Sequence, residues 1–165
     1  ANTIGNLLNR TASMARKWFG DAVPPAGDAI ATDHPLRQHA EATIRQVREA
    51  MPDMAFQRAS EAVLQLAIQA NGYLNERAPW SLMKQPGQED AVGSDLYAVL
   101  ECCRIVGLLL NPLVPDLSGR ILDQLGQETM PEQWQDALIW GKLASEQPLP
   151  KPNPVMQRLE LESPL

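Results

Sequence analysis

The ten residues Asn75–Lys84 read NERAPWSLMK and separate the two longest helical patterns of the chain, about 54–75 and 89–110. Proline lacks a backbone N–H and disfavours helical geometry in the residue before it. We therefore expect a helix to end just before Pro79, which should aim Trp80 off the end of the helices. An indole in such a place either packs under a loop or offers a stacking platform for a planar ligand. Position alone favours packing.

Apolar side chains recur at helical spacing along most of the chain, without β-type alternation or internal repeats. The helical pattern at 54–75, the third along the chain, has a wide, alanine-rich apolar stripe. This stripe predicts a central helix that its neighbours approach closely. The fold class is therefore all-α, an antiparallel bundle of about five helices. The predicted helices span 3–19, 35–51, 54–75, 89–110 and 116–125, with caps at Pro52-Asp53 and Pro115-Asp116, a connection at 21–34 and a short amphipathic piece at 131–138.

The C-terminal part of the chain has a different pattern. From Gly141 onward, prolines stand at positions 148, 150, 152 and 154, and these exclude regular helix. We expect a helical bundle over residues 1–140 and an extended, proline-rich tail over 141–165. Apolar residues in the tail, among them Val155, Met156 and Leu159, suggest that it lies in a groove of this domain or of a partner domain.

Composition narrows the possible functions. With 165 residues, 44% of them hydrophobic and 21% charged, the chain fits one globular domain. Cys102 and Cys103 are adjacent, which suits neither a disulfide nor a metal site and indicates core packing. His34 and His39, near a helix start, suggest capping or solvated roles. No catalytic constellation, membrane span or export signal is found, so the simplest location is cytoplasmic.

Charge is distributed unevenly along the chain. Residues 1–84 hold 9 Lys and Arg against 8 Asp and Glu, a net charge of +1, whereas residues 85–165 hold 5 against 12, a net charge of −7. An overall charge of −6 gives little support for non-specific binding to DNA or other long nucleic acids, because a broad basic surface supplies most of that affinity. A small, specific RNA contact on the first half remains open.

Three motifs together resemble the methionyl-tRNA synthetases. They are Ile4–Arg10 (IGNLLNR), Tyr73–Trp80 (YLNERAPW) and Leu110–Pro115 (LNPLVP), in the family's order and spacing. The resemblance covers residues 1–162 and is to the all-helical anticodon-binding domain of these class I enzymes. The closing segment Pro154–Glu160 is also similar, except that Met156 and Gln157 stand where the family commonly has Phe and Pro.

The resemblance implies a site for the CAU anticodon of the methionine tRNA. The family's anticodon readers fall on Asn6, Arg10 and Trp80, with Pro79 fixing the ring. Trp80 would stack on the first anticodon base, a cytosine, while Asn6 and Arg10 would hydrogen-bond to base edges. Single-stranded RNA is read in this way, by unstacking bases onto aromatic faces. The i, i+4 spacing of Asn6 and Arg10 places both on one helix face.

The family's catalytic signatures are not found. The sequence has no His-Ile-Gly-His or Lys-Met-Ser-Lys-Ser type stretch and no cysteine cluster of a zinc-bearing insert. We therefore expect a non-catalytic piece of a longer methionine–tRNA ligase whose catalytic domain is absent from this chain. The expected partners are the anticodon loop of the methionine tRNA and that catalytic domain, with no membrane or DNA partner. ATP with Mg²⁺, and Zn²⁺ where an insert carries it, would belong to the parent enzyme.

Two alternatives stay open from the sequence. The first is the anticodon domain of a sister class I synthetase for isoleucine, valine, leucine or cysteine, which would share the bundle but need other base readers. The second is a helical protein-interaction module with a docking tail, in which Trp80 is only a packed corner and Asn6 and Arg10 are merely solvated.

Overall fold

A computed structural model describes residues 3–127 and 132–156 of the chain. The described residues fold as an all-α bundle, as predicted, with no β-strand among them and a single isolated bridge between Ala22 and Pro148. The helical elements are α1 (Thr3–Trp18), the 3₁₀ turn η1 (Gly27–Ile30), α2 (Pro35–Ala50), α3 (Phe56–Arg77), α4 (Pro79–Leu82), α5 (Glu89–Leu110), α6 (Pro115–Gln124) and α7 (Trp134–Ala137).

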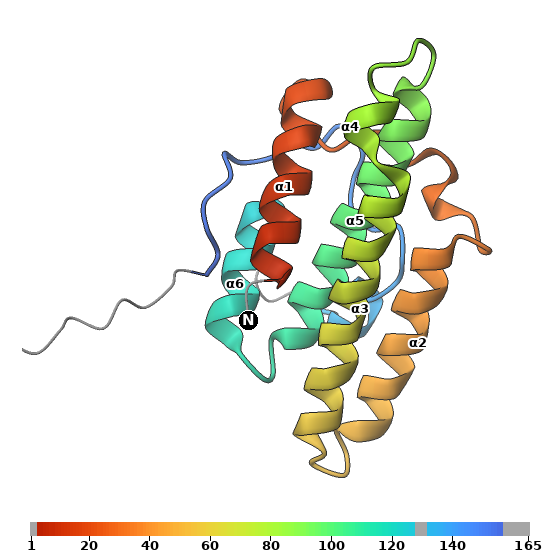
Figure 1. The fold of residues 1–165 in the computed structure, drawn as a ribbon. Coiled ribbons are helices and arrows are strands. Elements are labelled where there is room, and N and C mark those ends of the chain that lie inside the picture. The colour runs from red at the N-terminus through yellow and green to blue at the C-terminus, as the bar shows by residue number, and fades with distance from the viewer. Residues whose placement is uncertain (1–2, 128–131, 157–165) are drawn as a thin grey trace, which may run out of the picture.

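The central helix is α5. Every residue from Val92 to Leu110 is buried, because α1, α2, α3, α6 and η1 pack around it (Figure 1). The prediction that the third helix is central is therefore wrong. Leu64 and Ile68 of α3 are 45% and 46% exposed, so part of its wide apolar stripe faces solvent. The spacing of apolar residues alone could not distinguish a helix that is covered on one side, such as α3, from a helix that is surrounded by others, such as α5.

Helix boundaries agree with the prediction except where local hydrogen bonding decides them. Asp53 does not cap α3, which begins at Phe56 after a turn, with Ala55 at the N-cap position and no side-chain cap. Similarly, Pro115 and Asp116 are the first two residues of α6 and do not cap it. The connection at 21–34 contains η1, and the expected piece at 131–138 is reduced to α7, with Pro131 outside the described residues.

A buried ion pair on α5 holds the segment that follows α7. Arg104 Nη2 lies 2.6 Å from Glu101 Oε1, and both side chains are almost completely buried. The Glu101 carboxylate also accepts hydrogen bonds from the backbone N–H groups of residues 141–143, at 2.8–3.2 Å. Arg104 donates to the carbonyl oxygens of Ala137 and Ile139. The pair is thus satisfied on both sides, as buried charges must be.

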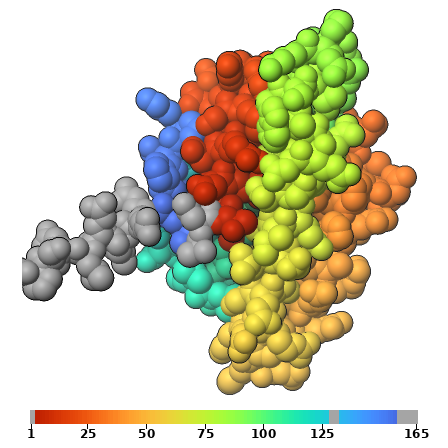
Figure 2. Space-filling view, viewed as in Figure 1, coloured from red at the N-terminus to blue at the C-terminus, as the bar shows by residue number. Residues whose placement is uncertain are grey.

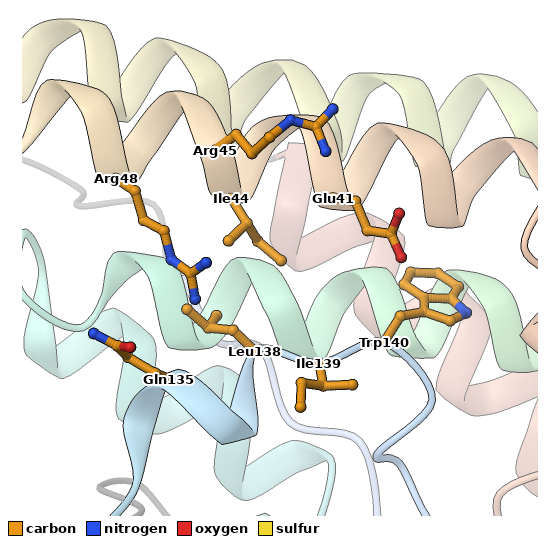
Figure 3. Close-up of a pocket in the computed structure, with 8 residues that line it drawn as sticks. All are labelled: Glu41, Ile44, Arg45, Arg48, Gln135, Leu138, Ile139 and Trp140. Atoms are coloured by element: carbon orange, nitrogen blue, oxygen red, sulfur yellow. The ribbon is translucent and has the colours of Figure 1, made fainter.

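Beyond residue 140 the described chain contains no helix, and it crosses the bundle as irregular backbone. Leu143, Leu149 and Val155 are buried and belong to the same apolar core as the helices. Leu159 lies outside the described residues, and the division of the chain at residue 140 stays a prediction. Figure 3 shows the residues just before this segment, where Leu138 faces Ile44 and Trp140 faces Glu41 of α2 across a cleft with Arg45 and Arg48 at its rim.

The cysteines and His34 have the structural roles that the sequence indicates. Cys102 and Cys103 are buried free thiols, and burial raises the pKa of Cys103 to about 12, so both pack as small apolar side chains. His34 is the N-cap of α2, because its Nδ1 accepts from the N–H of Leu36 at 3.2 Å.

Candidate nucleic-acid interface

A polar stripe of exposed residues runs along the outer side of α1 and consists of Asn6, Arg10, Ser13 and Lys17. Asn6 and Arg10 are exposed, whereas Ile4, Leu7 and Leu8 on the opposite side of the helix are buried against the core. Because one turn separates Asn6 from Arg10, the two side chains leave the helix in similar directions. Burial of the apolar side therefore fixes where these two polar groups stand.

The corner after α3 forms as the proline predicts. Ala78 leaves the helix with φ 44° and ψ 59°, in the left-handed region, while its N–H still donates to the carbonyl oxygen of Leu74 at 3.0 Å. Pro79 is buried and begins the one-turn helix α4, a position where its missing N–H costs nothing. The sequence predicted the corner but not α4, since four residues are too few for a periodic signal.

Arg10 brings the corner and α1 together. Its Nη2 donates to Asn75 Oδ1 near the end of α3 at 2.8 Å, and its Cζ lies 5.4 Å from the centre of the Trp80 ring, within cation–π range. Trp80 remains 39% exposed, so it is neither enclosed in the core nor free of contacts. The predicted residues Arg10, Pro79 and Trp80 thus form one constellation, with Asn6 one turn away on α1.

A buried carboxylate anchors the end of α3 that carries Asn75. Asp95 of α5, 3% exposed, accepts from the hydroxyl of Tyr73 at 2.7 Å and from Nε of Arg77 at 2.9 and 3.0 Å. Burial, followed by the hydrogen bond to Asp95, raises the pKa of Tyr73 well above its usual value, so the hydroxyl stays a donor. The last turn of α3, and with it the Trp80 corner, is therefore held on α5.

The sequence predictions missed two residues of this arrangement. Asn75 was quoted as part of a motif without a role, although it is the residue that holds the Arg10 guanidinium. Asp95 lies inside an apolar helical pattern, and its partners come from another helix. A carboxylate at a core-facing position is the one signal that could have revealed it, because a buried charge needs a partner.

Chemically, the constellation offers a ring face, a guanidinium fork and an amide side by side. Among residues 3–127 and 132–156, no group of three or more His, Cys, Asp or Glu could hold a metal ion, and no helix is long and apolar enough to cross a membrane. The arrangement suits the binding of an unstacked planar base.

Comparison with known proteins decides the family. The model of a family described as the anticodon binding domain of methionyl tRNA ligase matches residues 23–162. The chain belongs to this family. Trp80 and its corner lie inside the matched range, which does not include α1.

Relatives extend the match to nearly the whole chain. Methionine–tRNA ligases of Thermosynechococcus vestitus and Bacillus subtilis align with 98% of the chain, with 40% and 34% sequence identity respectively. A crystal structure of Mycobacterium tuberculosis methionyl-tRNA synthetase matches 98% of the chain with a TM-score of 0.85 and 33% identity. Since the relatives are named as methionine enzymes, neither the sister synthetases nor a plain interaction module is favoured. The anticodon-binding chain spans only a quarter to a third of these proteins: 32%, 24% and 33% of their lengths respectively.

Proposed function

We propose that this domain reads the CAU anticodon of the methionine tRNA, with Trp80 as the stacking platform and Asn6 and Arg10 as the base-edge readers. The observation that carries the proposal is the Arg10 guanidinium, held by Asn75 at 2.8 Å beside a partly exposed Trp80 ring. A packed corner does not need a cation placed at its ring. An RNA-reading site needs both a ring and a positioned donor.

Stacking and edge recognition have separate tasks in this proposal. Every base has a π-face, so stacking on Trp80 supplies affinity without identity. Cytosine offers acceptors at O2 and N3 and a donor at N4, whereas uracil replaces that donor with an acceptor. The guanidinium of Arg10 donates, and the Asn6 amide both donates and accepts. A site that pairs with the cytosine edge leaves polar groups unpaired when uracil enters, and this costs affinity.

The domain would serve a longer enzyme, a cytoplasmic ligase that attaches methionine to its tRNA. The proposed partners are that tRNA's anticodon loop and the catalytic domain of the same enzyme. ATP with Mg²⁺, and Zn²⁺ where an insert is present, would bind in the part that this chain does not span. In support, a structure of the Mycobacterium tuberculosis synthetase with bound methionyl-adenylate is 34% identical to the chain over 94% of its length.

The test compares two RNA stem-loops that differ only at the first anticodon base, CAU and UAU. Arg10→Ala or Asn6→Ala should narrow the difference in binding free energy between them by about 1–3 kcal/mol, the scale of base-edge contacts. Arg45→Ala is the matched control for charge, since Arg45 is an exposed arginine on α2 at the cleft of Figure 3. Equal losses on both RNAs would show that Arg10 and Asn6 supply charge or position and not identity.

A further inference from the structure

A second cleft borders α1 where this helix meets the segment that contains Lys151 and Pro152. Its volume is about 440 Å³, and it lies between the outer side of α1 and the segment that follows residue 148. Figure 2 shows this face, with α1 between the C-terminal segment and the edge formed by α3 and α4. The cleft is lined by Asn9, Ser13, Arg16, Lys17, Asp21, Lys151 and Pro152.

The lining is positively charged in a chain whose net charge is −6. Arg16 Nη2 pairs with Asp21 Oδ1 at 2.8 Å, so these two charges offset each other and Lys17 and Lys151 remain in excess. Arg16 Nε is buried and has no hydrogen-bond partner among the described residues. The cleft thus presents two ammonium groups that its one carboxylate does not offset, and this charge suits an anion.

The C-terminal wall of the cleft is fixed in place. Two residues before Lys151, the N–H of Leu149 donates to the carbonyl oxygen of Asp21 at 2.8 Å. Two residues after it, the N–H of Asn153 donates to Oε1 of Gln124 on α6 at 2.8 Å. Lys151 is therefore carried by backbone that is tied down on both sides. Residues more than 130 positions apart in sequence build one surface.

Helix α1 carries residues of both the cleft and the proposed base-reading site. Ser13 and Lys17 follow Arg10 by three and seven residues, so they lie on the same side of α1 as Arg10. Asn9 and Ser13 add polar side chains to the lining of the cleft. A nucleotide whose base lies against Trp80 would have its backbone leave along this stripe.

We propose that this cleft binds the sugar–phosphate backbone of the RNA loop whose base stacks on Trp80, with Lys17 and Lys151 contacting phosphates. This inference rests on the proposed function. Phosphate contacts position RNA and supply salt-dependent affinity, while base contacts specify sequence. A negatively charged domain can thereby gain affinity for one RNA segment without a broad basic surface.

The test is the salt dependence of stem-loop binding by the 165-residue chain. Binding of the CAU and UAU loops is measured at several salt concentrations, by NMR titration if affinity is weak, for the wild type, Lys17→Ala, Lys151→Ala and the double variant. Each lysine-to-alanine substitution should reduce the magnitude of the slope of log K against log salt by about 0.7, the value for one phosphate contact on a single strand. Affinity should fall equally for both loops, and the CAU/UAU ratio should not change.

Lys142→Ala is the matched control, because Lys142 is also exposed but does not line the cleft. The inference would be overturned if the salt slopes of the Lys17 and Lys151 variants equal the salt slope of Lys142→Ala. In that case, a preference of the wild type for the CAU loop would leave the proposed function intact. Loss of the CAU preference in the lysine variants would also overturn the inference. Wild-type binding without CAU preference contradicts the proposed function alone, and no binding of either loop contradicts both.

A titration with inorganic phosphate separates an RNA backbone site from a site for small anions. We expect only weak, unsaturated shifts of the cleft residues with phosphate alone. The inference is wrong if two results are found together. Phosphate would saturate the cleft in the wild type but not in the double variant, and the salt slopes of RNA binding would be equal for these two proteins. The cleft would then be a site for small anions.

Discussion

The guanidinium of Arg10 lies between the side-chain oxygen of Asn75, at 2.8 Å from Nη2, and the ring of Trp80, at 5.4 Å from Cζ to the ring centre. One residue of α1 thus links the end of α3 to the corner that follows it. A cation lies beside the indole, and 39% of Trp80 is exposed to solvent. In the proposed site, stacking and edge reading would therefore be coupled through Arg10.

This coupling predicts that Asn75 contributes to discrimination although it is not itself one of the proposed base readers. Asn75→Ala removes the acceptor that orients Arg10, so the guanidinium should lose part of its preference for the cytosine edge. The CAU/UAU difference should shrink by about 1 kcal/mol, the net value of such a hydrogen bond. Binding of both stem-loops checks this. Asn71→Ala, one turn earlier on α3, is the control and should leave the difference unchanged. An equal effect of the two variants would refute the coupling.

The left-handed conformation of Ala78 predicts a stabilising substitution. An L-residue in this region is strained by about 1–2 kcal/mol, whereas glycine is not, although glycine loses more entropy on folding. With φ at 44°, Ala78→Gly should raise the free energy of unfolding by about 0.5–1 kcal/mol in urea denaturation. Ala42→Gly inside α2 should lower it by about 1 kcal/mol. If both variants lose stability alike, Ala78 is not strained.

The buried pair on α5 predicts a large loss of stability. Glu101→Gln leaves the Arg104 charge buried without a counter-charge and should lower the free energy of unfolding by about 3–5 kcal/mol. The matched control is Glu41→Gln, which breaks a half-exposed pair with Arg37 at 2.8 Å. Such surface pairs contribute about 0.3–0.5 kcal/mol. Similar losses for the two variants in denaturant titrations would contradict the role given to Glu101.

His34 predicts a loss of stability in acid. Its Nδ1 accepts from Leu36 N–H and therefore carries no proton, so Nε2–H donates to the Tyr73 oxygen at 3.2 Å, and the Tyr73 hydroxyl donates to Asp95. Desolvation by burial lowers the pKa of His34 below its ordinary value of 6.5, against the opposing effect of Asp95. The unfolded chain then binds the proton more readily. The contribution of neutral His34 to the free energy of unfolding should be fully present above pH 6.5. It should be lost as the pH decreases below that value.

Thermal unfolding between pH 7.5 and 5.5 measures this effect. His34→Asn keeps an N-cap acceptor but does not titrate, so its melting temperature should fall less over that range than that of the wild type. Carboxylates that do not interact with His34 contribute equally to both proteins and cancel in the comparison. Parallel curves for the two proteins would show that His34 does not cause the loss.

Local signals allowed the fold to be predicted closely. The spacing of apolar residues predicts α1, α2 and α5 to within a residue, because burial of one or more sides of a helix is recorded in the sequence. The corner was also predictable, since Pro79 constrains its own backbone and that of Ala78.

Contacts between distant elements were not predictable in the same way. Nothing in the motif around Asn75 indicates that it meets Arg10, 65 positions earlier. The burial of Glu101 and Arg104 depends on backbone groups of residues 137–143, which helical periodicity does not describe. The cleft between α1 and Lys151 likewise exists only once the C-terminal segment is placed.

The most direct test of the central claim follows the Trp80 indole N–H by NMR during titration with a CAU stem-loop. Trp134 and Trp140 are internal controls, because their indole N–H groups are already bonded to the carbonyl oxygens of Leu108 and Ala29. The account predicts a large, saturable shift of the Trp80 signal with CAU, a smaller one at equal concentration of a UAU loop, and unmoved controls. An unperturbed Trp80 signal at saturating RNA would contradict it.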